Sequence, residues 1–282
     1  MSVETTKEQN PQMAEVVDWW EPPMPPTDLI FDDGEPLKSN RHRIAMNTLI
    51  RSLQQAWLDR NDFYTGGNMF IYFSSAQARN RDFRGPDFFV VLDVDGTRER
   101  QGWVVWEEDG RYPDVIVELL SSSTAQADRG TKKDIYERVF RTPDYFIFDP
   151  FDPNSLQGWH LDASQRYQPL APNEQGWLWC ESLDFWLGIW PGTIDRETAS
   201  WLRFYDTSGN LVLLPEEAAQ QQAQVAQQQA QVAQQQAQVA QQQAEVAQQQ
   251  AQVAQQQAQA ERQRAELLAA RLRELGVDPD NL

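Results

Sequence analysis

The feature that most constrains the fold of this chain is a seven-residue repeat that begins at Ala223. It runs for five tandem copies of AQVAQQQ, one of which has Glu245 in place of glutamine. Alanine and glutamine both propagate a helix well, and neither proline nor glycine interrupts the run. With Ala223 at heptad position a, alanines fill positions a and d of every copy, and the same register later brings leucines into this seam: Leu268, Leu272 and Leu275. The pattern predicts a coiled coil or a helical hairpin over residues 216–276, closed by Gly276.

We expect this segment to join copies of the chain into a homo-oligomer, with residues 277–282 as a short tail. A single solvated helix or a disordered Gln-rich linker is the alternative. Alanine, glutamine and valine offer no nucleophile and no metal ligand, so we expect any chemistry to lie in the preceding part of the chain.

The composition narrows the class of protein. The 282 residues include 24 basic and 42 acidic side chains, a net charge of −18, which argues against a basic nucleic-acid coat and against a polybasic membrane binder. The single cysteine, Cys180, excludes an intrachain disulfide framework and favours a reducing compartment. The first 26 residues lack the pattern of a secretion signal, and no apolar run is long enough to span a membrane. We therefore expect a cytoplasmic protein without membrane partners.

Residues 31–215 are predicted to form one globular domain after an irregular lead-in over residues 1–30. Hydrophobic spacing predicts a helix from about residue 42 to 59, capped by Ser39 or Asn40, and a second helix within 123–140. Strands are expected at residues 68–74, 86–93, 103–106, 113–120 and 144–149, followed by shorter strands that form a β-rich annex. Strands interleaved with helices predict a mixed α/β or α+β fold.

The strand at residues 113–120 contains the most informative residue of the chain. Side chains alternate along a strand, so Val117 and Leu119 face one way while Ile116 and Glu118 face the other way. Glu118 therefore lies within an apolar strand and needs a cation, a metal ion or a proton as its partner. An ion pair with an arginine in the core is the alternative to a functional role.

Polar side chains recur every four residues after this strand, and in a helix they would lie near one face: Thr124, Asp128, Lys132 and Tyr136. Lys133 is rotated about 100° away, and we expect it to be solvated. An ordinary helix ion pair between Asp128 and Lys132 is the alternative. Upstream, Asp87 opens another strand after a proline, where turn formation is the alternative to catalysis.

Asp87, Glu118 and Lys132 together would supply two carboxylates on neighbouring strands and a nearby ammonium, the minimal set for metal-assisted phosphodiester hydrolysis. Carboxylates are the hard oxygen ligands that Mg²⁺ takes in proteins. Such an ion would polarise a phosphoryl oxygen and activate a bound water. The lysine would orient that water or offset the charge that develops in the transition state.

Three stretches carry a resemblance to a known family: Gly34-Glu35-Pro36 leading to His42, then NRDFRGPDFFVVLDVDGTRER, then YPDVIVELLSSSTAQADRGTKKDIYERVFRTPDYFIFDP. Over roughly residues 30–190 the chain resembles the Uma-type restriction endonucleases of cyanobacteria, which are assigned to the PD-(D/E)xK nuclease superfamily. The resemblance implies a restriction-endonuclease-like core with a central mixed sheet, and cleavage of DNA with Mg²⁺ or Mn²⁺.

The resemblance further implies that Asp87 is the motif aspartate and that Glu118 fills the acidic position of (D/E)xK, both as metal ligands. Asp114 also follows a proline, but it shares a strand with Glu118 about 13 Å away at ~3.3 Å per residue, and it is the weaker candidate. The sequence departs from the superfamily pattern at the lysine position, where Leu120 stands.

The family's lysine corresponds to Lys132 on the following helix, with Lys133 as the second choice. Lys132 can reach the same metal ion only if that helix packs over the face of the strand that carries Glu118. Supporting roles are expected for a further set of residues: Glu35, His42, Asp128 and Tyr136.

The charge balance limits this function, because residues 1–215 contain 20 basic and 34 acidic residues, a net charge of −14. Affinity for duplex DNA rests on Lys and Arg side chains, so we expect local basic surface. The candidates lie close in sequence to the predicted site: Arg79, Arg81, Arg84, Arg98, Arg100, Arg129, Lys132, Lys133, Arg138 and Arg141. The competing hypothesis is a nuclease-like interaction protein without catalysis, which oligomerises through its coil. A third is an enzyme that acts on RNA or on small phosphoesters.

Overall fold

The computed structural model of the protein describes residues 25–31, 38–80, 85–121 and 123–276. Within these residues a six-stranded sheet has the order β1-β3-β5-β6-β7-β8, and β5 with β6 is its one parallel pair. Its strands are β1 (Phe63–Gly66), β3 (Phe88–Leu92), β5 (Val115–Leu119), β6 (Asp144–Asp149), β7 (Asp152–Leu161) and β8 (Tyr167–Pro169). A mixed sheet of this kind confirms the predicted α+β class.

The remaining strands form two smaller sheets. One has the antiparallel order β11-β10-β9, from Glu197–Tyr205, Phe185–Ile194 and Leu178–Cys180; the other pairs β2 (Ile71–Tyr72) with β4 (Trp103–Val104) in parallel. The predicted strand over residues 68–74 is thus much shorter than expected. The predicted annex is also not separate, since β7 and β8 extend the central sheet.

The helices of the globular unit begin with α1 (Asn40–Ala56), for which Ser39 is the N-cap, as predicted. A short α2 (Ser75–Arg79) and a 3-10 turn, η1 (Val105–Glu107), follow. The crossover between β5 and β6 is a run of α and π turns: α3 (Ala125–Ala127), η2 (Asp128–Lys132), α4 (Lys133–Ile135) and η3 (Tyr136–Phe140). A helical crossover is the usual link between parallel strands.

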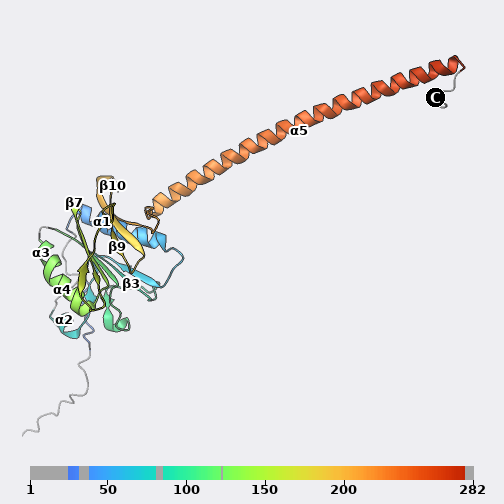
Figure 1. Ribbon diagram of the computed structural model, residues 1–282. Coiled ribbons are helices and arrows are strands. Elements are labelled where there is room, and N and C mark those ends of the chain that lie inside the picture. The colour runs from blue at the N-terminus through green and yellow to red at the C-terminus, as the bar shows by residue number, and fades with distance from the viewer. Residues whose placement is uncertain (1–24, 32–37, 81–84, 122, 277–282) are drawn as a thin grey trace, which may run out of the picture. The chain divides into compact units, whose positions relative to one another are not determined.

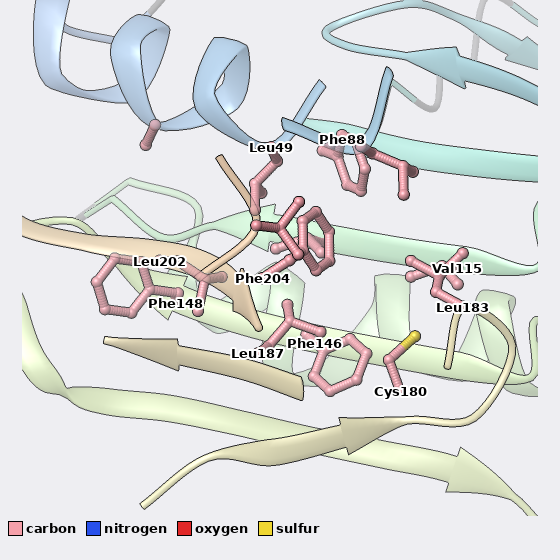
Figure 2. Packing of buried hydrophobic residues seen from close by; sticks show 14 of the residues in the cluster. Leu49, Phe88, Val115, Phe146, Phe148, Cys180, Leu183, Leu187, Leu202 and Phe204 are labelled. Atoms are coloured by element: carbon pink, nitrogen blue, oxygen red, sulfur yellow. The ribbon is translucent and has the colours of Figure 1, made fainter. Parts of the chain in front are cut away.

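The central sheet is covered on both faces, and β5 shows the predicted alternation. Val115, Val117 and Leu119 belong to one core cluster, whereas Ile116 belongs to the other. Figure 2 shows the first cluster, where Leu49 of α1 and side chains of β9, β10 and β11 meet the sheet. The second cluster includes Tyr136 from the crossover and therefore lies on the opposite face of the sheet. In Figure 1, α3 and α4 lie on the side of the sheet away from α1 and β10.

The chain divides into two compact units, Met1–Pro215 and Glu216–Leu282. The second contains nearly all of α5 (Pro215–Glu274), a helix of 60 residues that Figure 1 draws without interruption. It leaves its five repeat valines, from Val225 to Val253, about half exposed. Gly276, two residues after the helix, has φ +77°, the left-handed conformation that commonly follows a helix end. The described helices include none with the length and apolar character to cross a membrane.

Candidate active site

Asp87 and Glu118 come together because their strands are neighbours. Phe88 of β3 pairs with Val117 of the antiparallel β5, and one further step of this register sets Asp87 opposite Glu118. Residues directly opposite in an antiparallel pair share a face, with Cβ atoms about 5 Å apart. The Asp87 carboxylate also accepts a hydrogen bond at 2.8 Å from the backbone N–H of Leu119. Both acidic side chains are buried.

Glu118 is completely buried and held at both carboxylate oxygens. Lys132 Nζ lies 3.0 Å from Oε2, and the Tyr136 hydroxyl donates to Oε1 at 2.7 Å. Burial raises the pKa of Glu118 to about 8; the Lys132 charge opposes this rise, and the carboxylates of Asp87 and Asp128 add to it. The cation beside Glu118 is therefore a lysine from the crossover helix, and the alternative of a core arginine is wrong.

Lys132 reaches Glu118 because the crossover packs over the face of β5 that carries this residue. Its ammonium also lies 2.7 Å from Asp128 Oδ1, so the ordinary i,i+4 ion pair and the contact to Glu118 coexist. Burial acts to lower the pKa of Lys132, but the Glu118 and Asp128 carboxylates outweigh it and hold the pKa above its ordinary value. Lys132 thus remains a cation.

Lys38, which the sequence analysis did not identify, also lies at this site. Its Nζ is 3.3 Å from Asp87 Oδ2, 3.0 Å from the carbonyl oxygen of Leu119 and 3.2 Å from Thr124 Oγ1. These contacts join residues that are 49 to 86 positions apart, so no local spacing predicts them. The one available signal was that Lys38 falls within the matching stretch that leads to His42.

His42 links the start of α1 to the end of β5. Its Nε2 donates to the carbonyl of Leu120 at 3.0 Å, and its Nδ1 lies 2.8 Å from Ser39 Oγ, the helix cap. With the proton on Nε2, Nδ1 accepts from the serine hydroxyl. The buried imidazole therefore fastens the start of α1 to the end of β5, next to the carbonyl that Lys38 contacts.

Lys133 and Asp114 make their contacts away from Glu118. Lys133, the second-choice lysine, sits over the ring of Trp159 at 4.0 Å and not in bulk solvent. Asp114 accepts a hydrogen bond at 2.7 Å from the N–H of Leu92, at the end of β5 away from Glu118. Glu35 lies outside the described residues.

The basic residues named from the sequence do not form one free patch. Arg98 and Arg100 both pair with Glu108, at 3.3 and 2.7 Å, and Arg138 lies 3.7 Å from Glu137. Arg129 and Arg141 are exposed beside the crossover. Arg81 and Arg84 lie outside the described residues. Free positive charge near the site is therefore sparser than the sequence suggested.

The oxygens gathered here suit a hard divalent cation. The candidate donors are the carboxylates of Asp87 and Glu118 and the carbonyl of Leu119, whose oxygen already contacts the Lys38 ammonium. Mg²⁺ is commonly bound through one or two carboxylates while it keeps several waters. Within the described residues no group of three or more His, Cys, Asp or Glu side chains gathers as a metal site. The candidate donors are all oxygens, the ligand type that a magnesium ion takes in proteins.

Comparisons with known proteins match the same part of the chain. Residues 20–195 match the family model Uma2, described as "Putative restriction endonuclease". A search of solved structures finds a crystal structure of a "putative nuclease belonging to DUF820" from Anabaena variabilis ATCC 29413, 15% identical, with a TM-score of 0.38; the match covers 57% of this chain and 86% of that one. No curated protein matches the chain.

Proposed function

The chain belongs to the Uma2 family of "putative restriction endonucleases", as the sequence resemblance predicted, and on this premise we propose that it is a metal-dependent endonuclease that hydrolyses DNA phosphodiester bonds. The observation that carries the proposal is the convergence of Asp87, directly before β3, with Glu118 of β5 and Lys132 of the crossover. A solvated face would not bring two carboxylates and an ammonium together in a buried position.

Asp87 and Glu118, with the carbonyl of Leu119, would hold Mg²⁺ or Mn²⁺. When bound, this ion supplies a polarised phosphoryl oxygen and a water of lowered pKa. Tyr136 fixes the Glu118 carboxylate by its hydrogen bond, and Asp128 holds the Lys132 amine beside it. Lys132 would then orient the attacking water or offset negative charge that grows on the phosphate oxygens.

A cleavage assay with conservative variants tests this function. Purified protein is incubated with supercoiled plasmid DNA and Mg²⁺ or Mn²⁺, alongside Asp87→Asn, Glu118→Gln and Lys132→Met. We expect each variant to lose at least 100-fold in rate, in the range typical for a residue that assists chemistry. Lys133→Met is the matched control, because this lysine is the chain neighbour of Lys132 but contacts Trp159, and it should cut normally.

Two results would contradict the proposal. Equal cutting by the wild type and all three site variants would mean that the activity comes from elsewhere. Absence of cutting by a folded wild type with either metal ion, on DNA and on RNA, would favour the competing hypothesis of a non-catalytic interaction protein. The net charge of −14 on residues 1–215 favours that hypothesis, because negative charge repels DNA phosphates.

We also propose that α5 joins copies of the chain. The heptad seam and the half-exposed valines of this helix support self-association, and paired active sites are useful to an enzyme that cuts both strands of a duplex.

A further inference from the structure

Lys38 places a positive charge among the oxygens that would bind a metal ion. Its ammonium contacts Asp87 Oδ2, the Leu119 carbonyl and Thr124 Oγ1 within 3.3 Å, and the side chain is only 26% exposed. Three oxygen partners satisfy all three donors of a lysine ammonium. Lys38 is an exposed residue whose ammonium is nonetheless held by three oxygens at once.

Two of these oxygens are also the candidate metal donors. A divalent ion bonded to Asp87 and to the Leu119 carbonyl would lie within a few ångströms of the ammonium, where like charges repel strongly even with partial screening by water. Lys38 contacts two of the three candidate donors, whereas Lys132 contacts only one, Glu118, so the ion competes above all with the Lys38 ammonium.

Two lysines and three acidic side chains meet here, and the contacts divide the acids between the lysines. Lys132 is bound to Glu118 and Asp128, whereas Lys38 is the cation at Asp87. Removal of the Lys38 charge would leave Asp87 buried beside two other carboxylates, an arrangement that strongly favours a replacement cation.

We propose that Lys38 is an internal competitor of the metal ion: it occupies the Asp87–Leu119 donors in the metal-free protein and must be displaced before the ion binds. This inference rests on the proposed metal-dependent function. It predicts that the wild type binds metal more weakly than its carboxylates alone would, because only the fraction of molecules with Lys38 displaced is competent to bind.

Calorimetric titration of the full chain with Mn²⁺ tests the inference. Lys38→Met keeps most of the aliphatic stem and removes the charge, and we expect its Kd for Mn²⁺ to be at least 10-fold lower than that of the wild type. Lys38→Gln should act in the same direction, which covers the case in which Lys38→Met does not fold. Lys38→Arg retains the positive charge and should bind no more tightly than the wild type. Lys133→Met, whose lysine lies on Trp159, should leave the Kd unchanged.

A second measurement does not depend on activity. The rise in Tm on adding Mn²⁺ should be larger for Lys38→Met than for the wild type, since the variant gains a cation without losing one. A Kd equal to or higher than the wild-type value in folded Lys38→Met or Lys38→Gln overturns the inference. If the wild type nevertheless cuts plasmid DNA, the proposed nuclease function is kept and only the role of Lys38 is wrong. If no form binds Mn²⁺ and none cuts DNA, both the nuclease function and the role of Lys38 are wrong.

Discussion

At the scale of single residues, the burial of Glu118 has a direct consequence for stability. Its pKa is raised to about 8 in the folded protein, from about 4.5 when unfolded. A carboxyl group with a raised folded pKa contributes stability that is fully present below pH 4.5 and is lost as the pH rises through about 8. The metal-free protein therefore becomes less stable toward alkaline pH because of this residue.

Glu118→Gln should remove that loss, since glutamine has no charge to desolvate. In urea unfolding with EDTA we expect the variant and the wild type to be similar at pH 5, and the variant to be more stable by about 2–4 kcal/mol at pH 9. Glu174→Gln, at an exposed turn, is the control and should follow the wild type at both pH values. A Glu118→Gln variant that is equally destabilised at pH 5 and pH 9 would show that Glu118 is ionised throughout.

Cys180 offers a second test at this scale. Its thiol is fully buried, and burial together with the Asp144 carboxylate at 3.7 Å raises the pKa of the thiol well above its ordinary value. Only the thiolate reacts readily with aromatic disulfide reagents. We expect no labelling of the native protein at pH 8 and one thiol per chain after unfolding in urea. Rapid labelling of the native protein would contradict the packing around this residue.

At the scale of elements, the start of α1 connects the fold to the site. Ser39 Oγ accepts a hydrogen bond from the N–H of His42 and contacts the His42 ring, which in turn donates to the Leu120 carbonyl. Ser39→Ala should cost about 1–2 kcal/mol in urea unfolding, because it removes the cap and leaves a buried imidazole nitrogen without its partner. Ser39→Asn, also a good cap, should recover most of this loss. Identical unfolding midpoints for Ser39→Ala and the wild type would show that the cap does not stabilise the fold.

Elements with a strong local pattern were predictable. The strand at β6 (Asp144–Asp149) has the predicted bounds, and α1 and β5 lie close to theirs, because each combines a hydrophobic period with a clear cap or turn. β1 (Phe63–Gly66) was missed, since its four residues alternate too briefly to stand out and it forms by pairing with β3. The length of β7 was likewise set by its pairing with β6, which no local pattern shows.

The residues of the candidate site likewise fall into those with a local sequence signal and those brought together only by tertiary folding. Glu118 and Lys132 could be selected because a carboxylate within an apolar strand and a four-residue polar period are local signals. Asp87 could be selected because it follows a proline at a strand entrance and matches the motif aspartate of the family. The carbonyl of Leu119 and the amine of Lys38 could not, because any residue has a carbonyl and because the contacts of Lys38 depend on tertiary folding. Sequence thus indicated which acids gather, but not which cation neutralises Asp87.

At the scale of the whole molecule, net charge and assembly both affect how strongly the protein could bind DNA. With −14 on residues 1–215 and several arginines already paired with acids, a single copy offers little free charge to DNA phosphates. Association through α5 would place more than one copy of the exposed basic side chains on one duplex, and linked binding events raise the overall affinity without any new contact. Oligomerisation would therefore matter to binding as well as to the cutting of both strands.

Assembly through α5 can be tested by placing charge in its seam. The triple variant Ala230→Glu, Ala237→Glu and Ala244→Glu introduces like charges at successive a positions, where a helix partner would have to bury them. In sedimentation equilibrium we expect the wild type to exceed its monomer mass of 32.5 kDa and the variant to fall to that mass.

The matched control carries the same added charge on the far side of the helix, at heptad position f: Gln228→Glu, Gln235→Glu and Gln242→Glu. This control should remain associated, because position f faces solvent in a coiled coil. A wild type that sediments as a monomer at all concentrations would mean that α5 is a solvated single helix, and each copy would then have to bind DNA with its own sparse basic surface.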